Sequence, residues 1–238
     1  MAGRSLLRTC PAKLSMEQTI QPQAFFFTPP LYTAAFGHIM AELWKERVYD
    51  PYLPLKKEGS VALDIGANVG LVTYYLAQHF EKVYSLEPFS AHFQNLLRMV
   101  NFNQLTNVEP IKKAIHIKEG LFGFGAEGNN QTVKSLHQAV WMGKEPEEQV
   151  ETITFEKLFE DFKIDHVDLL KLDVEGSEIE LLSHPGFRAV APKIRTMIIE
   201  RHAWTGRNPH QLDEALKNAG FKVETIPNQA DLLVAKRI

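Results

Sequence analysis

The sequence predicts an α/β protein in which a doubly wound, mostly parallel sheet follows an N-terminal helical extension. Short apolar runs bounded by turn residues alternate with stretches of helical periodicity, the pattern of strand-helix-strand units. Two of the early apolar runs end in an acid, at Asp64 and at Glu87. The last two strand-like runs, 220–226 and 231–236, are joined by a Pro-Asn turn. That turn predicts a closing hairpin and therefore an antiparallel last strand.

The elements follow one another along the chain. Helical spacing of apolar residues covers Leu31 to Val48, and a turn follows it. Strands are expected at 61–65, 82–87, 108–113, 150–153, 166–172, 195–201, 220–226 and 231–236. Helices are expected at Leu71–Phe80, Ser90–Phe102, Phe155–Phe162, Ser177–Leu182 and Pro209–Ala219. The glycine-rich stretch Gly120 to Gly128 is expected to be a loop, either mobile or folded over a ligand.

Two parts of the chain are distinguished by composition. Residues 1–57 are interpreted as a leader and helical extension that forms a lid or rim, with contact in a homodimer as the alternative. Residues 58–238 form the main domain. The first 16 residues contain three basic residues and no acid, which we interpret as a leader without a targeting function.

The composition of the chain excludes several classes of protein and site. The chain has 238 residues, 45% hydrophobic residues and a formal net charge of −3, so no strong phosphate-binding surface is indicated. Its single cysteine, Cys10, excludes an internal disulfide framework and a cysteine-based zinc site. No apolar run reaches membrane-spanning length, and we expect a cytoplasmic protein.

The most specific motif is a strand, a glycine turn and a helix from Val61 onward. Its glycines, Gly66 and Gly70, are spaced G-x-x-x-G rather than in the G-x-G-x-x-G pattern that binds a dinucleotide pyrophosphate. Asp64 stands before the first glycine, where an acid suits a positively charged ligand such as the ammonium and sulfonium of S-adenosylmethionine. Glu87 ends the next strand, where an acid usually holds a ribose diol.

These residues carry a resemblance to a known family. The sequence D-I-G-A-N-V-G at 64–70 resembles motif I of class I methyltransferases in the form typical of the FkbM family. The L-E-P-F at 86–89 is similar to the family's second block, and D-L-L-K-L-D-V-E-G-S-E at 168–178 resembles its signature segment. The resemblance implies a Rossmann-like, seven-stranded sheet and S-adenosylmethionine as the cofactor. It also implies methyl transfer to a hydroxyl of a sugar, glycan or secondary metabolite.

The expected cofactor residues follow from these motifs. The turn is expected to wrap the methionine part of the cofactor, the acid at 87 to hold the ribose, and an aromatic side chain to lie on the adenine. The residues concerned are Asp64, Gly66, Asn68, Gly70, Glu87 and Phe89, with Lys113 and Ala114 on the other side of the adenine.

The expected catalytic residues are acids at strand ends. Methyl transfer to a hydroxyl requires an acceptor held in line with the methyl group and a base to remove its proton. Asp173 is expected to orient the acceptor and Glu200, assisted by His202, to take the proton. Glu175 is a candidate either for catalysis or for capping the next helix, whereas Glu178 is interpreted as a cap.

Two questions stay open at this point. Lys171 lies in an apolar strand, and it either pairs with an acid such as Glu200 or takes part in catalysis. The acids at 173, 175 and 200, together with His202, could also gather a hard cation such as magnesium, although a metal-free site is favoured.

Other functions remain possible for such a fold. One is an RNA ribose methyltransferase and another is a non-catalytic nucleotide-binding module. The only dense basic runs are Lys56-Lys57 and Lys112-Lys113, which gives weak support for binding nucleic acid. A small-molecule or glycan acceptor is therefore favoured.

Overall fold

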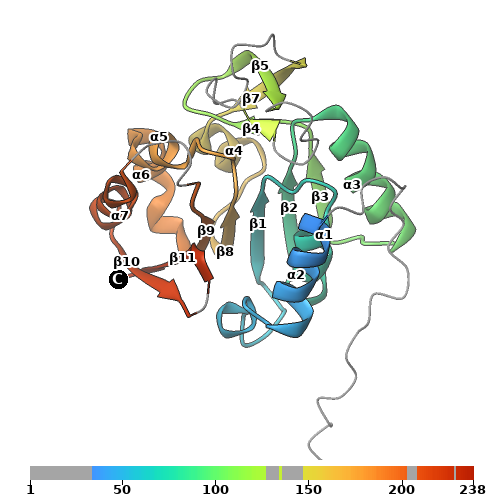
Figure 1. Cartoon of the computed structure of the whole chain (residues 1–238), viewed down its shortest axis with the longest axis horizontal. Coiled ribbons are helices and arrows are strands. Elements are labelled where there is room, and N and C mark those ends of the chain that lie inside the picture. Colours follow the sequence, from blue (N-terminus) through green and yellow to red (C-terminus); the bar gives the residue numbers. More distant parts are fainter. Residues whose placement is uncertain (1–33, 127–133, 136–146, 203–207, 228) are drawn as a thin grey trace, which may run out of the picture.

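The computed structural model describes residues 34–126, 134–135, 147–202, 208–227 and 229–238. Its centre is a seven-stranded sheet in the order β10-β11-β9-β8-β1-β2-β3 (Figure 1). The strands are β1 (Val61–Ile65), β2 (Lys82–Leu86), β3 (Val108–Ile111), β8 (Val167–Leu172), β9 (Ile194–Glu200), β10 (Phe221–Ile226) and β11 (Gln229–Arg237). The predicted doubly wound sheet is confirmed.

The strand directions also agree with the prediction. All pairs from β9 to β3 are parallel, whereas β11 runs antiparallel to both β10 and β9. The chain extends the sheet from β1 through β2 to β3 on one side, and later from β8 to β9 on the other. The strand order therefore reverses between β1 and β8, where Asp64 is in register with Lys171. Ligands of open parallel sheets bind at the carboxyl ends of the strands at such a point.

Helices cover both faces of the sheet (Figure 1). One face packs against α2 (Leu71–His79) and α3 (Ser90–Phe102). The other packs against α4 (Phe155–Asp161), α5 (Glu178–Ser183), α6 (Pro185–Val190) and α7 (Pro209–Asn218). Because side chains alternate along a strand, Ala62 joins the first apolar cluster and Leu63 the second. The short helix α6, with the 3-10 turn η4 (Ala191–Lys193) after it, was not predicted.

The N-terminal segment is packed on α2. The expected helix at 31–48 is divided into α1 (Ala34–Met40) and the π-helical turn η1 (Ala41–Lys45), and the 3-10 turn η2 (Asp50–Tyr52) follows. Residues 31–33 lie outside the described residues. Leu43 is 1% exposed and belongs to the apolar cluster of the α2 face. The Trp44 ring contacts the rings of Tyr74 and Tyr75. The segment thus shares the core of the main domain.

A second, four-stranded sheet lies beyond the carboxyl ends of β1 and β2, in the order β4-β7-β5-β6 (Figure 1). Its strands are β4 (Ala114–Ile115), β5 (Gly120–Ala126), β6 (Lys134–Ser135) and β7 (Glu148–Ile153). One expectation was wrong here, because the expected loop at 120–128 is a strand as far as Ala126. The strand expected at 150–153 is present as part of β7 and lies in this second sheet. Glycines disfavour strands, but pairing of β5 with β7 supplies the backbone hydrogen bonds.

Among the helices that the structure describes, none is both long enough and apolar enough to cross a membrane.

Candidate active site

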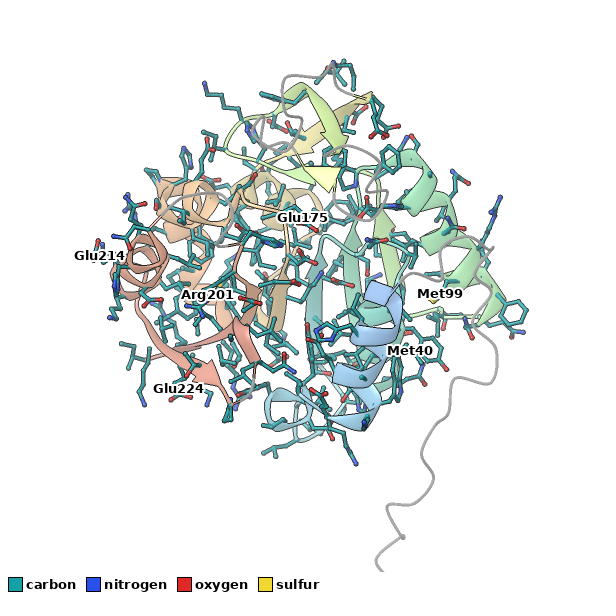
Figure 2. The ribbon with its side chains drawn as sticks, viewed as in Figure 1. Met40, Met99, Glu175, Arg201, Glu214 and Glu224 are labelled. Carbon is teal, nitrogen blue, oxygen red and sulfur yellow. The ribbon has the colours of Figure 1, made fainter. Side chains whose placement is uncertain are left out.

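A cleft opens where β1, β2 and β8 end. Its empty space, counted to its open mouth and including open solvent, is about 570 Å³. Strands of the second sheet contribute to its wall, and Glu175, another lining residue, is labelled in Figure 2. The lining residues are Ile65, Gly66, Asn68, Leu86, Glu87, Pro88, His92, Lys113, Ala114, Ile115, Phe124, Asp173, Val174, Glu175 and Ser177.

The glycine turn after β1 brings the backbone to the cleft. Gly66 has φ +80°, and a Cβ placed on it would lie 1.8 Å from the Asp173 carbonyl oxygen. Only glycine fits this approach of two chain segments. Asn68 also lines the cleft and adopts a left-handed conformation, with φ 50°. Gly70 (φ +95°) does not line the cleft. It begins α2, where a Cβ would meet the side chains of Leu96 and Met99, the latter labelled in Figure 2.

Asp64 lies beneath the cleft rather than in its wall. Its side chain is 0% exposed, and its Oδ2 accepts a hydrogen bond of 2.6 Å from the Thr73 hydroxyl of α2. Its Oδ1 has no hydrogen-bond partner and lies 3.7 Å from Lys171 Nζ. Burial raises the pKa of Asp64, and the Lys171 ammonium opposes that shift. The structure therefore gives Asp64 an anchoring position under the turn.

Glu87 is buried at the end of β2 and lines the cleft. Its two carboxylate oxygens accept backbone hydrogen bonds from Asn68, at 2.8 Å, and from Phe89, at 2.9 Å. Each oxygen keeps a lone pair that can accept a further bond. Burial raises the pKa of Glu87 to about 7, although the two backbone bonds act against the shift. The acid predicted for the ribose is therefore in place.

Aromatic residues form one wall of the cleft. Phe89, expected on the adenine, is not among the lining residues and stacks on Phe124, with ring centroids 6.2 Å apart. Phe124 and His92 line the cleft in its place. The expected border at Lys113 and Ala114 does line it. The sequence did not single out Phe124, because it lies in the stretch interpreted as a loop.

Lys171 joins the floor of the site to the glycine turn. Its Nζ donates hydrogen bonds to the Gly66 carbonyl oxygen at 2.7 Å and to Asp173 Oδ2 at 3.1 Å. Although burial works against its charge, Asp173 and Asp64 raise its pKa above the ordinary value of lysine. A permanently charged, bonded ammonium cannot serve as a base. These contacts favour the structural reading of Lys171, with Asp173 rather than Glu200 as its bonded partner.

His202 lies among three acids. Its Nδ1 is 2.7 Å from Glu178 Oε1, and its Nε2 is 3.1 Å from Glu175 Oε2 and 3.7 Å from Asp173 Oδ1. Burial opposes its charge, but the bonds to Glu175 and Glu178 raise its pKa to about 11. An imidazole that keeps its proton at neutral pH cannot assist as a base. The expected assisting role of His202 therefore does not fit this geometry.

The turn after β8 fixes the two glutamates of the signature segment. Glu178 Oε1 also accepts hydrogen bonds from the backbone N–H groups of Gly176, at 3.1 Å, and Val174, at 3.4 Å. Glu178 thus anchors the turn that begins α5. Glu175 adopts a left-handed φ of 50°, and its carboxylate faces His202. Glu175 therefore belongs to the polar side of the cleft rather than to the helix end.

Glu200 ends β9 and is partly buried, outside the lining of the cleft. The neighbouring charge of Asp173, together with burial, raises the pKa of Glu200 to about 8. Lys171 and His202 act against the shift. Glu200 is therefore mostly protonated at neutral pH and becomes a base only as the pH approaches 8.

Tyr49 comes from the N-terminal segment and was missed by the sequence. It is 4% exposed, and its ring contacts Tyr75. Burial raises the pKa of Tyr49 well above the ordinary value, and the charges of Asp64, Glu42 and Glu200 add to the effect. No local pattern marks such a residue, because it reaches these acids only through packing.

The fold is that of a class I, Rossmann-like α/β protein with a cleft at the carboxyl ends of its parallel strands. The sequence model of the methyltransferase FkbM domain matches residues 64–223. The chain belongs to the FkbM family of methyltransferases. This confirms the resemblance seen in its motifs.

The chain is also similar to individual proteins. The methyltransferase sdnD of Sordaria araneosa is 24% identical, over 84% of this chain and 89% of that protein. The crystal structure of an FkbM methyltransferase from Methylobacillus flagellatus KT has a TM-score of 0.50 and 17% identity, over 77% of this chain. The match covers 44% of that bacterial chain. An S-adenosylmethionine-dependent methyltransferase from Aquifex aeolicus has a TM-score of 0.45 and 16% identity, over 84% of this chain and 95% of the other.

Proposed function

We propose that this methyltransferase uses S-adenosylmethionine and transfers the methyl group to a hydroxyl of a sugar, glycan or secondary metabolite. The observation that carries the proposal is the pairing of a cleft lined by Glu87, Phe124 and Ala114 with a group of acids at the ends of β8 and β9.

The residues of the cleft fit the proposed cofactor. Glu87 offers free lone pairs to a ribose diol, and Phe124 and Ala114 offer apolar surface to a purine. The glycine turn at Gly66 lets a ligand approach the backbone closely. Bound there, S-adenosylmethionine would supply a methyl group activated by a positive sulfonium, and the surplus of carboxylates suits that charge.

The chain's own residues would then position and deprotonate the acceptor. The acceptor oxygen forms a bond to the methyl carbon as the carbon–sulfur bond breaks, its electron pair stays on sulfur, and the hydroxyl proton leaves. Asp173 lines the cleft and is held by Lys171, so it can orient the acceptor. Glu200 is the acid next to it with a pKa near the working range of a general base.

The charge of the site favours an uncharged acceptor. Four carboxylates are grouped with two cationic side chains around the ends of β8 and β9: Asp173, Glu175, Glu178 and Glu200 with Lys171 and His202. A phosphate brought among these acids would be repelled. The site is therefore better suited to a neutral hydroxyl compound than to RNA.

Calorimetric titration tests the cofactor. We expect S-adenosylhomocysteine and S-adenosylmethionine to bind at one site per chain, and NAD not to bind. Phe124→Ala should weaken S-adenosylhomocysteine about tenfold because it removes an aromatic wall of the cleft. Phe122→Ala is the matched control, since Phe122 lies on the same strand, packs on His116 and does not line the cleft. Failure of the unaltered protein to bind either adenosyl compound would refute the proposal.

Incubation with methyl-labelled S-adenosylmethionine tests the acceptor class. Neutral sugar and polyol fractions should become labelled, and RNA should not. If only RNA became labelled, the acceptor would be RNA, and the proposed methylation of a sugar, glycan or secondary metabolite would be refuted.

A further inference from the structure

We infer that Asp173, Glu175 and His202 form a binding site for a divalent cation at the acceptor side of the cleft. Whether the cation binds is independent of the proposed function. The role of the cation in the reaction rests on the proposed function.

The three side chains converge from two elements. Asp173 and Glu175 follow β8, and His202 follows β9, the neighbouring strand. One ligand atom from each lies within 4.8 Å of the others. Around an octahedral ion with ligands at about 2.1 Å, adjacent ligand atoms are about 3.0 Å apart. His202 Nε2 lies 3.1 Å from Glu175 Oε2 and 3.7 Å from Asp173 Oδ1, so small side-chain movements would complete three neighbouring positions.

One oxygen of the group has capacity for a further ligand. Asp173 Oδ1 faces His202, and this atom is buried without a hydrogen bond. Its separation of 3.7 Å from His202 Nε2 is too long for a hydrogen bond. Buried polar atoms are nearly always satisfied, so an unsatisfied carboxylate oxygen among metal-ligating side chains supports a site for an ion.

His202 is held as metal-binding histidines are held. Its Nδ1 faces Glu178 Oε1 at 2.7 Å, and that oxygen is itself fixed by the Gly176 N–H. A carboxylate on one ring nitrogen fixes the ring and directs the other nitrogen to the metal. Here the other nitrogen points at Glu175 and Asp173. Without a metal that nitrogen is protonated, so a cation would displace its proton on binding.

The ligand set indicates the kind of cation. Two carboxylates favour Mg²⁺ and Mn²⁺, and an imidazole extends the range toward Fe²⁺ and Zn²⁺. Three protein ligands on one side leave the remaining positions toward the cleft, which Asp173 and Glu175 line. A hydroxyl that reaches such an ion has a lowered pKa, and two adjacent oxygens would reach it together. The inference therefore narrows the acceptor to compounds with adjacent oxygens, such as a vicinal diol.

Titration with Mn²⁺, followed by calorimetry and by electron paramagnetic resonance without cofactor, tests the site. The full chain should bind one Mn²⁺. Glu175→Gln and His202→Gln should each weaken binding about tenfold or more. Glu180→Gln is the matched control, because Glu180 carries the same charge on the exposed side of α5. Its affinity should equal that of the unaltered chain. Mg²⁺ and Zn²⁺ titrations then rank the cations.

The outcomes are decisive in both directions. Absence of saturable binding of Mn²⁺, Mg²⁺ and Zn²⁺ by the unaltered chain would overturn the inference, as would equal affinity in Glu175→Gln and Glu180→Gln. If His202→Gln fails to fold, Glu175→Gln alone decides, with its melting temperature as the check on folding. If the chain binds S-adenosylhomocysteine but no cation, this inference is refuted and the proposed function stands. If the chain binds a cation but neither S-adenosylhomocysteine nor S-adenosylmethionine, only the proposed function is refuted.

Discussion

Buried charge decides how single residues behave in this site. Lys171 and His202 are each held by two or more acceptors, so both are cations rather than proton carriers while no metal is bound. The acids around them differ in how far neighbouring cations offset their charge. The pKa of Glu87 is raised to about 7 and that of Glu200 to about 8, so their protonation changes in the physiological range.

Cofactor affinity should depend on the protonation of Glu87. In the proposed complex the ionised carboxylate accepts hydrogen bonds from both ribose hydroxyls, and protonation, with a pKa of about 7, would turn one acceptor oxygen into a donor. We expect the affinity for S-adenosylhomocysteine to be constant above pH 8 and to fall about tenfold per unit well below pH 7. Calorimetry from pH 5.5 to 8.5 measures this, with Glu87→Gln as the variant that should lose the dependence. A flat profile in the unaltered protein would exclude Glu87 from the ribose site.

Glu200 should control the rate rather than the binding. Glu200→Gln keeps the shape of the side chain but cannot take a proton, so we expect unchanged S-adenosylhomocysteine affinity and about 10²-fold slower methylation. Because the pKa of Glu200 is about 8, turnover should rise with pH and level off above that value. Initial rates on an acceptor found by labelling measure both effects. Full turnover by the variant would show that Glu200 is not the base.

Among the elements, the turn between β1 and α2 depends on a glycine at position 66. Gly66→Ala would place a methyl group against the Asp173 backbone in a left-handed conformation, so we expect a loss of about 2–4 kcal/mol of unfolding free energy. Gly59→Ala is the control, because Gly59 has φ +72° and open space around it, and the backbone cost alone is about 1–2 kcal/mol. Chemical denaturation compares them. Equal losses would mean that the contact with Asp173 is unimportant.

The elements also show what the sequence could predict. Strand ends with an acid and a glycine are local patterns, so the turns at Gly66 and Asp173 and the position of Glu87 could be predicted. Phe124 and Tyr49 could not, because each reaches the site through pairing or packing between distant segments. The strand β5 was not predicted, because its glycines are typical of a loop. The protonation of His202 depends on three acids, and these come close to its ring only in the folded structure.

For the whole molecule, the crowded acids should make stability depend on pH. A carboxyl whose folded pKa is raised binds its proton more tightly in the folded state, so its contribution is present below the unfolded pKa and lost as pH rises through the folded one. For Glu87 that window runs from 4.5 to about 7 and corresponds to about 3 kcal/mol. The contribution of Glu200 to stability has the same sign, and it is lost as the pH rises to about 8, the pKa of Glu200 in the folded protein.

We therefore expect the melting temperature of the ligand-free protein to fall between pH 5.5 and 8.5. Glu87→Gln should reduce the slope because it removes one of the titrating groups. Differential scanning calorimetry across that range measures both. A melting temperature that rises with pH would contradict the protonation states described for the site.

The small second sheet has a consequence for the lifetime of a complex. It contributes Phe124 and Ala114 to the cleft wall and adds only a few short strands, so its backbone should open more readily than the central sheet. Release of a bound nucleoside would then be timed by this opening. Hydrogen exchange of the β5 and β7 amides should slow when S-adenosylhomocysteine binds, while that of β8 stays unchanged. A substitution that loosens the second sheet would shorten the residence time of the ligand without altering the chemistry at β8 and β9.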